Sequence, residues 1–288
     1  MNLRGKRVLV TGAGGGIGSA LVNHLIGQGA SVLLTGRDDA ALRNVIAGLD
    51  VAGERAIHMH ADLAQARDRA RLCDTARSWQ GGIDVLINNA GLGEFGMLAD
   101  RSTADIERTI AINLAVPMDL CRNLLPFLQL RPEAHIVNIG SAFGSIGFAA
   151  SSIYCASKFG LRGFSEALRR ELADTQVKVH YFAPRATRTA INSAPVDDLN
   201  AALGNAVDDP DEVAAQIVAL LRKGRVESVL GWPEKFFARV NGLLPRLVDR
   251  ALRKNLSVIQ QHARMNPAPV SQISVQPVPD SNRYRRAG

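Results

Sequence analysis

TGAGGGIG, residues 11–18, follows the short apolar run KRVLVT (residues 6–11) and leads into a segment of helical period. Glycine lets a backbone turn tightly and approach a pyrophosphate, and free N–H groups at the start of a helix stabilise its negative charge. The spacing reads T-G-x-x-x-G-x-G and not the literal G-x-G-x-x-G. Because strand, glycine turn and helix occur in the required order, the stretch predicts a dinucleotide-binding loop in preference to a flexible turn without a ligand.

Short β-branched runs alternate with longer segments of helical period throughout the first 231 residues, which indicates βαβ units in a parallel sheet. Strands are expected at 6–11, 31–35, 55–60, 83–88, 134–140, 177–183 and 227–231. Helices are expected at 17–28, 38–48, 64–79, 103–129, 152–174 and 210–223. Because all seven strands are mostly apolar, helices should cover both faces of the sheet.

Composition narrows the classes of protein that the 288 residues can form. Apolar residues make up 47% of the chain and charged residues 21%, which is typical of a globular protein with a sizeable core. No stretch reaches the roughly 20 apolar residues of a membrane-spanning helix. The three cysteines form no C-x-x-C pair and no group with zinc-ligand spacing, so neither a disulfide framework nor a metal site is expected. We therefore expect a cytosolic protein.

The second half of the chain contains two departures from the βαβ pattern. Residues 185–208 are small and polar with little periodicity, and a loop of this length is typical of a functional segment. Residues 1–231 are expected to form one catalytic domain, and 232–266 an amphipathic, basic helical extension that Pro245 should kink or divide. Residues 267–288, rich in Pro, Ser and Gln, are expected to be a disordered tail.

The basic residues of the extension raise the question of a partner. From Gly231 onward there are ten Lys and Arg against three Asp and Glu, and this surplus equals the whole net charge of +7. A stripe of Phe, Leu and Val beside these bases is typical of a helix on an anionic membrane, which would make residues 232–262 a peripheral membrane contact. The other interpretation is that the extension packs on its own domain and covers the segment 185–208, or that it packs on a second subunit. Nucleic acid is not expected, because aromatic stacking residues are scarce.

Three further motifs stand at separations that match the glycine loop. They are Asn88-Asn89-Ala90-Gly91, Ser141 and Tyr154-Cys155-Ala156-Ser157-Lys158. Together they resemble the classical short-chain dehydrogenase/reductase family over about residues 4–231. The resemblance implies an α/β, three-layer, doubly wound Rossmann fold with a seven-stranded parallel sheet, followed here by a C-terminal helical extension. It also implies hydride transfer between NAD(P)(H) and a small-molecule carbonyl or alcohol, in a homodimer or homotetramer.

Four residues match the catalytic set of that family. Tyr154 and Lys158 are separated by four positions, so one helix face carries both, and a nearby ammonium favours the phenolate. The resemblance implies that Tyr154 is the general acid/base and that Lys158 binds the nicotinamide ribose. It also implies that Ser141 holds the substrate oxygen and that Asn113 holds a water that links the lysine to solvent.

The second expected strand ends in Gly36-Arg37, where relatives that use NAD carry a carboxylate. Arg37 can pair with a 2′-phosphate, so NADP(H) is the expected cofactor, with NAD(H) as the alternative. Asp38 and Asp39 are explained as first-turn helix residues. The resemblance assigns seventeen residues to the cofactor: Gly12, Gly14, Gly15, Gly16, Ile17, Gly18, Arg37, Asp62, Leu63, Asn89, Ala90, Gly91, Tyr154, Lys158, Pro184, Thr187 and Thr189.

Some residues have no clear assignment. Arg185 stands where the family has glycine, and we give it no role. Glu94 and Phe95 either line the substrate cleft or belong to an exposed loop, and Asp62 can also be the N-cap of the helix at 64–79. We expect an active reductase or dehydrogenase with an apolar substrate. The alternative is a protein that binds the cofactor as a sensor or scaffold and acts through residues 232–262.

Overall fold

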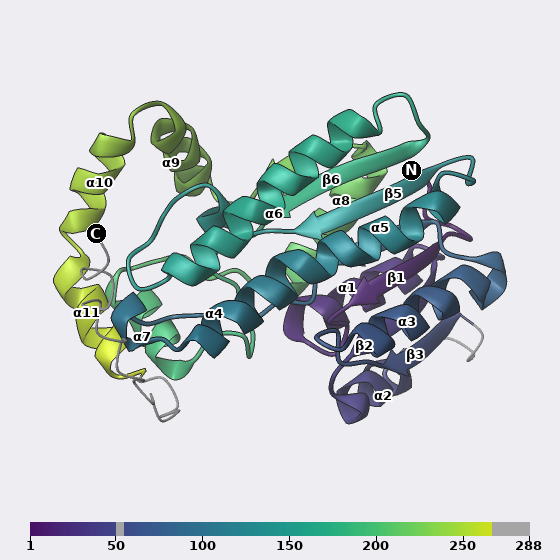
Figure 1. Cartoon of the computed structure of the whole chain (residues 1–288), viewed down its shortest axis with the longest axis horizontal. Coiled ribbons are helices and arrows are strands. Elements are labelled where there is room, and N and C mark those ends of the chain that lie inside the picture. The colour runs from purple at the N-terminus through teal and green to yellow at the C-terminus, as the bar shows by residue number, and fades with distance from the viewer. Residues whose placement is uncertain (50–54, 267–288) are drawn as a thin grey trace, which may run out of the picture.

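The computed structural model describes residues 1–49 and 55–266, and the predicted tail at 267–288 lies outside the described residues. A single seven-stranded sheet has the order β3-β2-β1-β4-β5-β6-β7, and every neighbouring pair is parallel (Figure 1). Its strands are β1 Arg7–Thr11, β2 Ser31–Gly36, β3 Ala56–His60, β4 Val85–Asn88, β5 Ala134–Ile139, β6 Val177–Ala183 and β7 Glu227–Val229. All seven predicted strands are confirmed, each within two residues at either end.

Helices cover both faces of this sheet, which makes three layers. The first half of the chain contributes α1 Gly16–Gly27, α2 Asp39–Ala47, α3 Ala66–Ser78, α4 Thr103–Ile110 and α5 Val116–Leu128. The second half contributes α6 Ser152–Glu171, α7 Ala194–Ala202, α8 Pro210–Lys223, α9 Trp232–Leu243, α10 Pro245–Arg253 and α11 Leu256–Arg264. The predicted three-layer, doubly wound α/β fold is thus confirmed.

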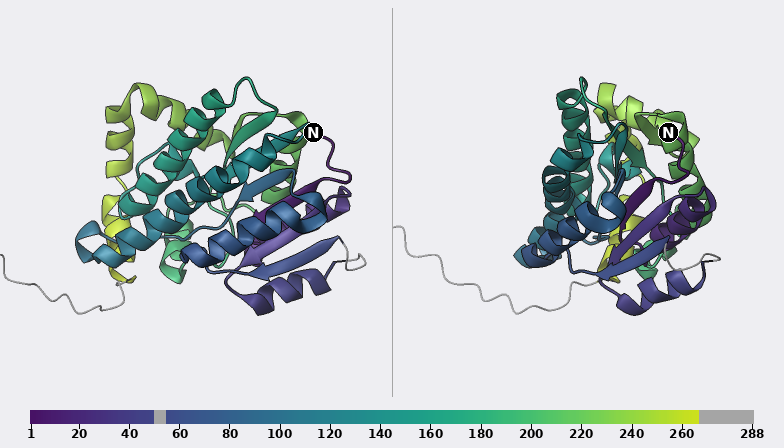
Figure 2. Two further views of the ribbon diagram at one scale, coloured as in Figure 1. Left: turned by 45° about the vertical axis from the view of Figure 1, so that its right-hand side comes forward. Right: turned by 90° about the vertical axis from the view of Figure 1, so that its right-hand side faces the viewer.

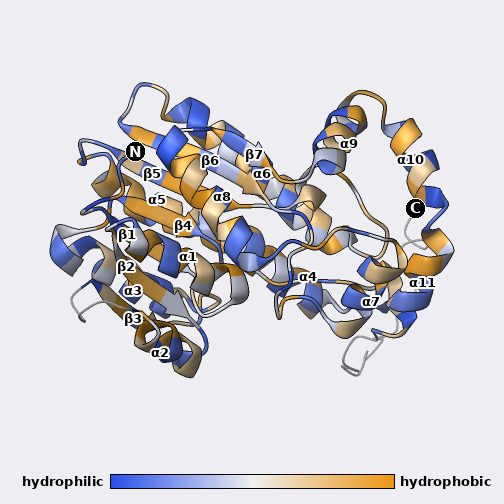
Figure 3. Cartoon of the chain, turned by 180° about the vertical axis from the view of Figure 1, so that it is seen from behind, coloured by the Kyte–Doolittle hydropathy of each residue, from blue (hydrophilic) through white to orange (hydrophobic). Residues whose placement is uncertain are grey.

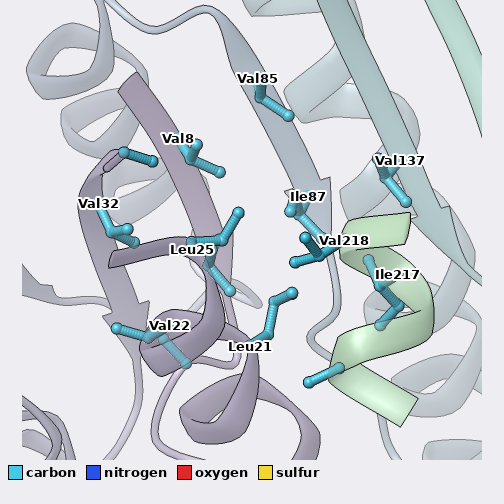
Figure 4. Close-up of a cluster of buried hydrophobic side chains, with 14 of the residues drawn as sticks. Val8, Leu21, Val22, Leu25, Val32, Val85, Ile87, Val137, Ile217 and Val218 are labelled. Atoms are coloured by element: carbon cyan, nitrogen blue, oxygen red, sulfur yellow. The ribbon is translucent and has the colours of Figure 1, made fainter. Parts of the chain in front are cut away.

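The core lies between the sheet and its helices. On one face, Leu21 and Leu25 of α1 meet Ile217 and Val218 of α8 over the strands (Figure 4). On the other face, α3, α5 and α6 pack on the same strands. Because strand side chains alternate between faces, the apolar strands supply both cores at once. This double burial fixes the carboxyl ends of β1 and β4, where the strand order reverses and ligands of open α/β sheets bind.

The helix predicted at 103–129 is interrupted, which corrects the expectation of one continuous helix. Residues Ala111–Ala115 form a π-helical turn between α4 and α5. Pro117 has no N–H for the carbonyl of Asn113 four residues earlier, and its ring would collide with that carbonyl in a regular helix. The extra residue in the turn removes the collision, so Asn113 stands at the irregular point of the helix.

The segment 185–208 contains α7, which the sequence did not predict. Pro195 stands in the first turn of this nine-residue helix, where a missing N–H costs nothing. Leu199 of α7 is buried in a cluster with Phe95 and with Ile259 and Ala263 of α11. The helix is therefore stabilised by a partner far along the chain, which local periodicity does not reveal.

The extension forms three helices at the end of the sheet to which the strands point (Figure 1; yellow-green in Figure 2). As predicted, Pro245 divides it, between α9 and α10. Figure 3 shows hydrophobic residues along the central strands but a mixture of hydrophobic and hydrophilic residues along α9 to α11. Among residues 1–49 and 55–266, no helix has the length and apolar character needed to cross a bilayer.

Candidate active site

Tyr154 and Lys158 lie one turn apart on α6 and line one cavity of about 530 Å³. The Nζ atom of Lys158 lies 5.7 Å from the centre of the Tyr154 ring, within the range of a cation–π contact. Lys158 is only 5% exposed, and its Nζ donates a hydrogen bond to the carbonyl oxygen of Ile139 at 3.0 Å. The structure therefore brings the phenol and the amine together, as their spacing predicts.

Burial shifts the pKa of both groups toward the neutral species. It raises the pKa of Tyr154 to about 12, although a hydrogen bond with Ser141 acts in the opposite direction. It lowers the pKa of Lys158 to about 8. Because this value still lies above 7, most Lys158 side chains are charged at pH 7. The pair thus combines a protonated phenol with an adjacent positive charge.

Ser141 follows the carboxyl end of β5 and lines the same cavity as Tyr154. Its Oγ accepts a hydrogen bond from the N–H of Phe143 at 3.1 Å, which fixes the hydroxyl at the start of a short turn. The end of β5 therefore contacts Lys158 through the carbonyl of Ile139 and places Ser141 in the same cavity as Tyr154. A hydroxyl, a phenol and an ammonium converge where a polar atom of a ligand can be held.

Asn113 is buried behind the cavity and does not line it. Its Oδ1 accepts from the N–H of Leu92 at 2.7 Å, and its Nδ2 donates to the carbonyl of Leu92 at 2.9 Å and to Ser157 Oγ at 3.1 Å. At Gly91, an added Cβ would lie 3.4 Å from Asn113 Oδ1 and 3.7 Å from Lys158 Nζ. Asn113 therefore fixes the loop after β4 against α6, beside the lysine.

A second cavity, a groove of about 570 Å³, runs from the start of α1 past the end of β2. Most of the residues predicted to hold a cofactor line it: Gly12, Gly14, Gly15, Gly16, Ile17, Gly18, Arg37, Leu63, Asn89, Ala90, Gly91 and Thr189. Pro184 and Thr187 line the 530 Å³ cavity instead, together with Tyr154 and Lys158. Sixteen of the seventeen residues predicted to hold the cofactor therefore line either the groove or the 530 Å³ cavity.

Glycine geometry at the start of α1 fits a bound pyrophosphate. A Cβ at Gly18 would lie 2.1 Å from the carbonyl oxygen of Gly12, and one at Gly16 would lie 2.6 Å from Cγ2 of Thr189. Gly15 is the N-cap residue and offers no side chain to the first N–H groups of the helix, whose first turn has no acid. These N–H groups and the helix dipole are suited to an anion.

The end of β2 shows why two nearby acids do not settle the cofactor's identity. Asp38 is the N-cap of α2, and its carboxylate accepts from the N–H of Ala41 at 3.0 Å. Asp39 pairs with Arg43 and, at 3.1 Å, with His58. Both carboxylates thus have partners in the protein, although Asp38 lines the groove together with Arg37.

Asp62 is the one predicted cofactor residue that stands outside the walls of the groove and the 530 Å³ cavity. Its carboxylate accepts from the N–H of Ala64 at 3.1 Å. The alternative interpretation, an N-cap of the following helix, is wrong, because α3 begins at Ala66 with Gln65 as its N-cap residue. Asp62 closes the turn that precedes the helix.

The extension supplies the far wall of the 530 Å³ cavity, through Phe237, Val248, Ala251, Leu252 and Asn255. Val248 is buried, and α11 packs on α7. The extension therefore packs on its own domain, which is one of the arrangements that the sequence left open. The interpretation that the extension covers the segment 185–208 agrees with the packing of α11 on α7, but the sequence did not show that α9 and α10 line the 530 Å³ cavity.

A third cavity, of about 350 Å³, adjoins the 530 Å³ cavity and shares Phe143, Phe148 and Tyr154 with it. Glu94 and Phe95 line this third cavity, so they belong to a cleft and not to an exposed loop. Cys155 is buried on the other side of α6 from Tyr154, with its Sγ accepting from the N–H of Phe148 at 3.4 Å.

Arg185, which had no predicted role, closes the base of the segment that carries α7. Its Nε and a terminal nitrogen both donate to Asp208, at 2.9 and 2.6 Å. A β-bridge between Thr187 and Asp208 joins the same two stretches of the chain. Arg185 therefore replaces the family's glycine with an ion pair that holds the segment closed.

Comparisons with known proteins agree with this geometry. A family model described as short chain dehydrogenase matches residues 6–200. The protein named "Ketoacyl reductase HetN" from Nostoc sp. is 32% identical over 259 residues, which cover 87% of this chain and 89% of the relative. The "3-oxoacyl-[acyl-carrier-protein] reductase FabG" of Vibrio harveyi is 31% identical over 225 residues, which cover 76% and 91%.

A crystal structure shows the same likeness in three dimensions. A short-chain dehydrogenase from Streptomyces avermitilis superposes with a TM-score of 0.74 at 27% sequence identity, over 89% of this chain and 98% of that chain. The resemblance indicated by the motifs is confirmed. The chain belongs to the short-chain dehydrogenase family and is an NAD(P)-dependent oxidoreductase that acts on CH–OH or carbonyl groups.

Proposed function

We propose that this protein catalyses reversible hydride transfer between NADP(H) and an apolar carbonyl compound or alcohol. One observation carries the proposal: Tyr154, Lys158 and Ser141 line a cavity with an apolar far wall, and this cavity adjoins the glycine groove. Five residues line both spaces and mark the junction where the reactive ring of the cofactor would lie: Ile17, Asn89, Gly91, Thr189 and Ile191.

Each catalytic residue has one task at the substrate oxygen. In reduction, Tyr154 donates its phenolic proton to the carbonyl oxygen, and in oxidation it accepts the proton of the hydroxyl. Ser141 donates a hydrogen bond to the same oxygen. The Lys158 ammonium stabilises the phenolate that remains after proton transfer, and it holds the ribose hydroxyls of the cofactor. The bound nicotinamide supplies or accepts the hydride at the substrate carbon.

Two residues support this set from behind and from the side. After Tyr154 has given its proton to the substrate, Lys158 returns a proton to the phenolate, and the water that the family resemblance places at Asn113 returns a proton from solvent to the lysine. The position of Asn113 beside Gly91 and Lys158 supports this role. Thr189, which packs against Gly16, would meet the carboxamide of the nicotinamide.

Arg37 supports the preference for NADP(H). A guanidinium at the groove wall can pair with a 2′-phosphate, while the neighbouring Asp38 carboxylate is used to cap α2. Arg37→Ser should therefore reduce the ratio of NADPH to NADH affinity about tenfold or more, as measured by fluorescence titration. An unchanged ratio would leave Arg37 without a role at the 2′ position.

The first experiment is a turnover assay with a panel of substrates. Ketones, aldehydes, quinones and 3-oxoacyl thioesters would be offered with NADPH or NADH; the thioesters are included because two relatives are named ketoacyl reductases. Tyr154→Phe should lower kcat about 10²- to 10⁴-fold, since it removes only the proton donor. Tight cofactor binding without turnover of any substrate would favour the alternative, a sensor or scaffold.

The α9–α10 surface supports a second proposed contact, with an anionic membrane. Trp232 is 73% exposed and Leu243 is 81% exposed, and both lie on the helix that also carries Lys235 and Arg239. Bases beside exposed Trp and Leu side chains are typical of a helix at a lipid surface. A second copy of the same basic surface would be repelled by it, which makes lipid the better match.

Tryptophan fluorescence in the presence of lipid vesicles tests this contact. The chain has two tryptophans, so Trp79→Phe leaves Trp232 as the reporter. Anionic vesicles should shift its emission to shorter wavelength, zwitterionic vesicles should not, and Leu243→Ser should weaken the effect several-fold. Leu130→Ser is the matched control, because Leu130 is equally exposed on a different helix end. A change in oligomer size without any vesicle effect would assign the surface to a subunit contact.

A further inference from the structure

Glu94 and Arg101 form a buried ion pair in the wall of the 350 Å³ cavity. Arg101 Nε lies 2.9 Å from Glu94 Oε1, and the side chains are 5% and 16% exposed. Neither atom makes a hydrogen bond, because the N–H does not point at the carboxylate oxygen. The guanidinium and the carboxylate therefore attract each other electrostatically, but the Nε–H donor and the Oε1 acceptor both remain without a hydrogen bond.

Arg101 has its own anchors, so Glu94 is not needed to hold it in place. A terminal nitrogen of Arg101 donates to the backbone carbonyls of Phe95 and, at 3.0 Å, of Asn266. Asn266 in turn donates from Nδ2 to the carbonyl of Phe95 at 2.6 Å. The guanidinium thus ties the loop after β4 to the end of the extension, and it presents a fixed positive charge to Glu94.

Glu94 lines the cavity, while its Oε1 is buried against Arg101 Nε and accepts no hydrogen bond. Burial raises the pKa of its carboxyl group, while the Arg101 charge acts against that shift and favours the ionised form. A buried polar atom without a hydrogen bond is costly, and native proteins contain few of them. The Glu94 carboxylate, as part of the cavity wall, is therefore suited to accept a hydrogen bond from a donor group of a ligand in this cavity.

The position of the cavity relative to Tyr154 indicates which part of a ligand would meet Glu94. Tyr154 lines both the 530 Å³ cavity, with its apolar wall from α9 and α10, and the 350 Å³ cavity, with its charged end. A carbonyl at Tyr154 would therefore have space on two sides, one apolar and one that ends in a carboxylate.

We propose that Glu94 recognises a hydroxyl or amino group of the substrate, on the arm that extends from the carbonyl into the 350 Å³ cavity. Arg101 is a positioning residue that keeps the acceptor ionised and in place. The inference rests on the proposed function for the location of the carbonyl, and it defines the substrate as a carbonyl compound with one apolar arm and one shorter arm that carries a hydrogen-bond donor.

Paired ligands test the proposal. Two ketones would be compared that share the apolar arm and differ only in whether the short arm ends in a hydroxyl or a methyl group. The wild-type protein should prefer the hydroxyl form, and Glu94→Leu combined with Arg101→Met should reduce this preference about 10- to 100-fold, mainly through KM. The double variant removes both charges together, which avoids leaving one of them buried alone. Glu107→Gln, an exposed acid on α4, is the matched control and should keep the preference.

Binding of the same two ketones to Tyr154→Phe with NADPH separates this inference from the proposed function. A preference for the hydroxyl form in binding, with no turnover by the wild type, would support the recognition by Glu94 and contradict the catalytic proposal. Turnover of both ketones at equal efficiency, or an unchanged preference in a folded double variant, would overturn the inference. Failure of the protein to bind either ketone would overturn it as well.

Discussion

Leu25 of α1 is completely buried between the sheet and α8, whereas Leu243 of α9 is 81% exposed. The two residues represent two regions with different physical properties. Residues 1–230 carry no net charge and contain two large cores, while the chain from Gly231 onward carries the whole surplus of +7. The first region fixes Tyr154 and Lys158, and the second forms only the outer wall of their cavity. Under the proposed function, the proton-transfer residues lie in the first region, and the second contributes an apolar wall against which a substrate would pack.

The largest effect is expected from Gly18→Ala, in the first region. The added Cβ would lie 2.1 Å from the carbonyl oxygen of Gly12, against backbone that cannot move without opening the turn. We expect a loss of about 4 kcal/mol or more in the free energy of unfolding, measured without cofactor by urea denaturation. Gly15→Ala is the matched control, because its Cβ would have 3.5 Å to the nearest atom. Equal stability of the two variants would contradict the packing argument.

A core truncation should affect stability and not substrate preference. Leu25→Ala creates a cavity between α1 and the sheet, and such a change costs about 2–5 kcal/mol. The ratio of kcat/KM for long and short apolar substrates should stay the same below the melting temperature. A changed ratio would show that the two regions are coupled.

The pH dependence tests Lys158. Its pKa is lowered to about 8 by burial, so the ammonium is present below pH 8 and is lost as the pH rises through this value. Carbonyl reduction should therefore fall up to about tenfold per pH unit above pH 8, while the fold, measured by circular dichroism, is retained. A reduction rate that stays constant from pH 7 to pH 9.5 would remove the ammonium from the mechanism.

The smallest effect is expected in the extension. Leu252→Ala enlarges the apolar wall of the cavity and should raise KM for long apolar substrates about three- to tenfold. The melting temperature should change little, because Leu252 is only partly buried. Leu247→Ala is the control, since Leu247 is 52% exposed on the same helix and does not line the cavity. Equal effects of both variants would mean that the wall does not contact the substrate.

The sequence-based predictions also differ in success between these two regions. In the first region, the strands, most helices and the glycine turn could be predicted because each depends on local periodicity and on glycine geometry. One failure is local, because Pro117 interrupts the predicted helix at Asn113; the other is not, because α7 depends on contacts with α11, far along the chain. In the extension, the helices, the break at Pro245 and packing over the segment 185–208 were predictable, but not that α9 and α10 line the cavity of Tyr154.

The sequence by itself determined the α/β class, the parallel sheet, the glycine turn before α1 and the Tyr154–Lys158 pair, because strand period, glycine content and helical spacing are properties of neighbouring residues. Only the tertiary structure decided that α9 and α10 form a cavity wall with Tyr154 and that Arg185 pairs with Asp208. It alone also left Glu94 beside Arg101 with an unused acceptor. These features depend on side chains brought together from distant segments, and their burial free energy has no signature in any short stretch of the chain.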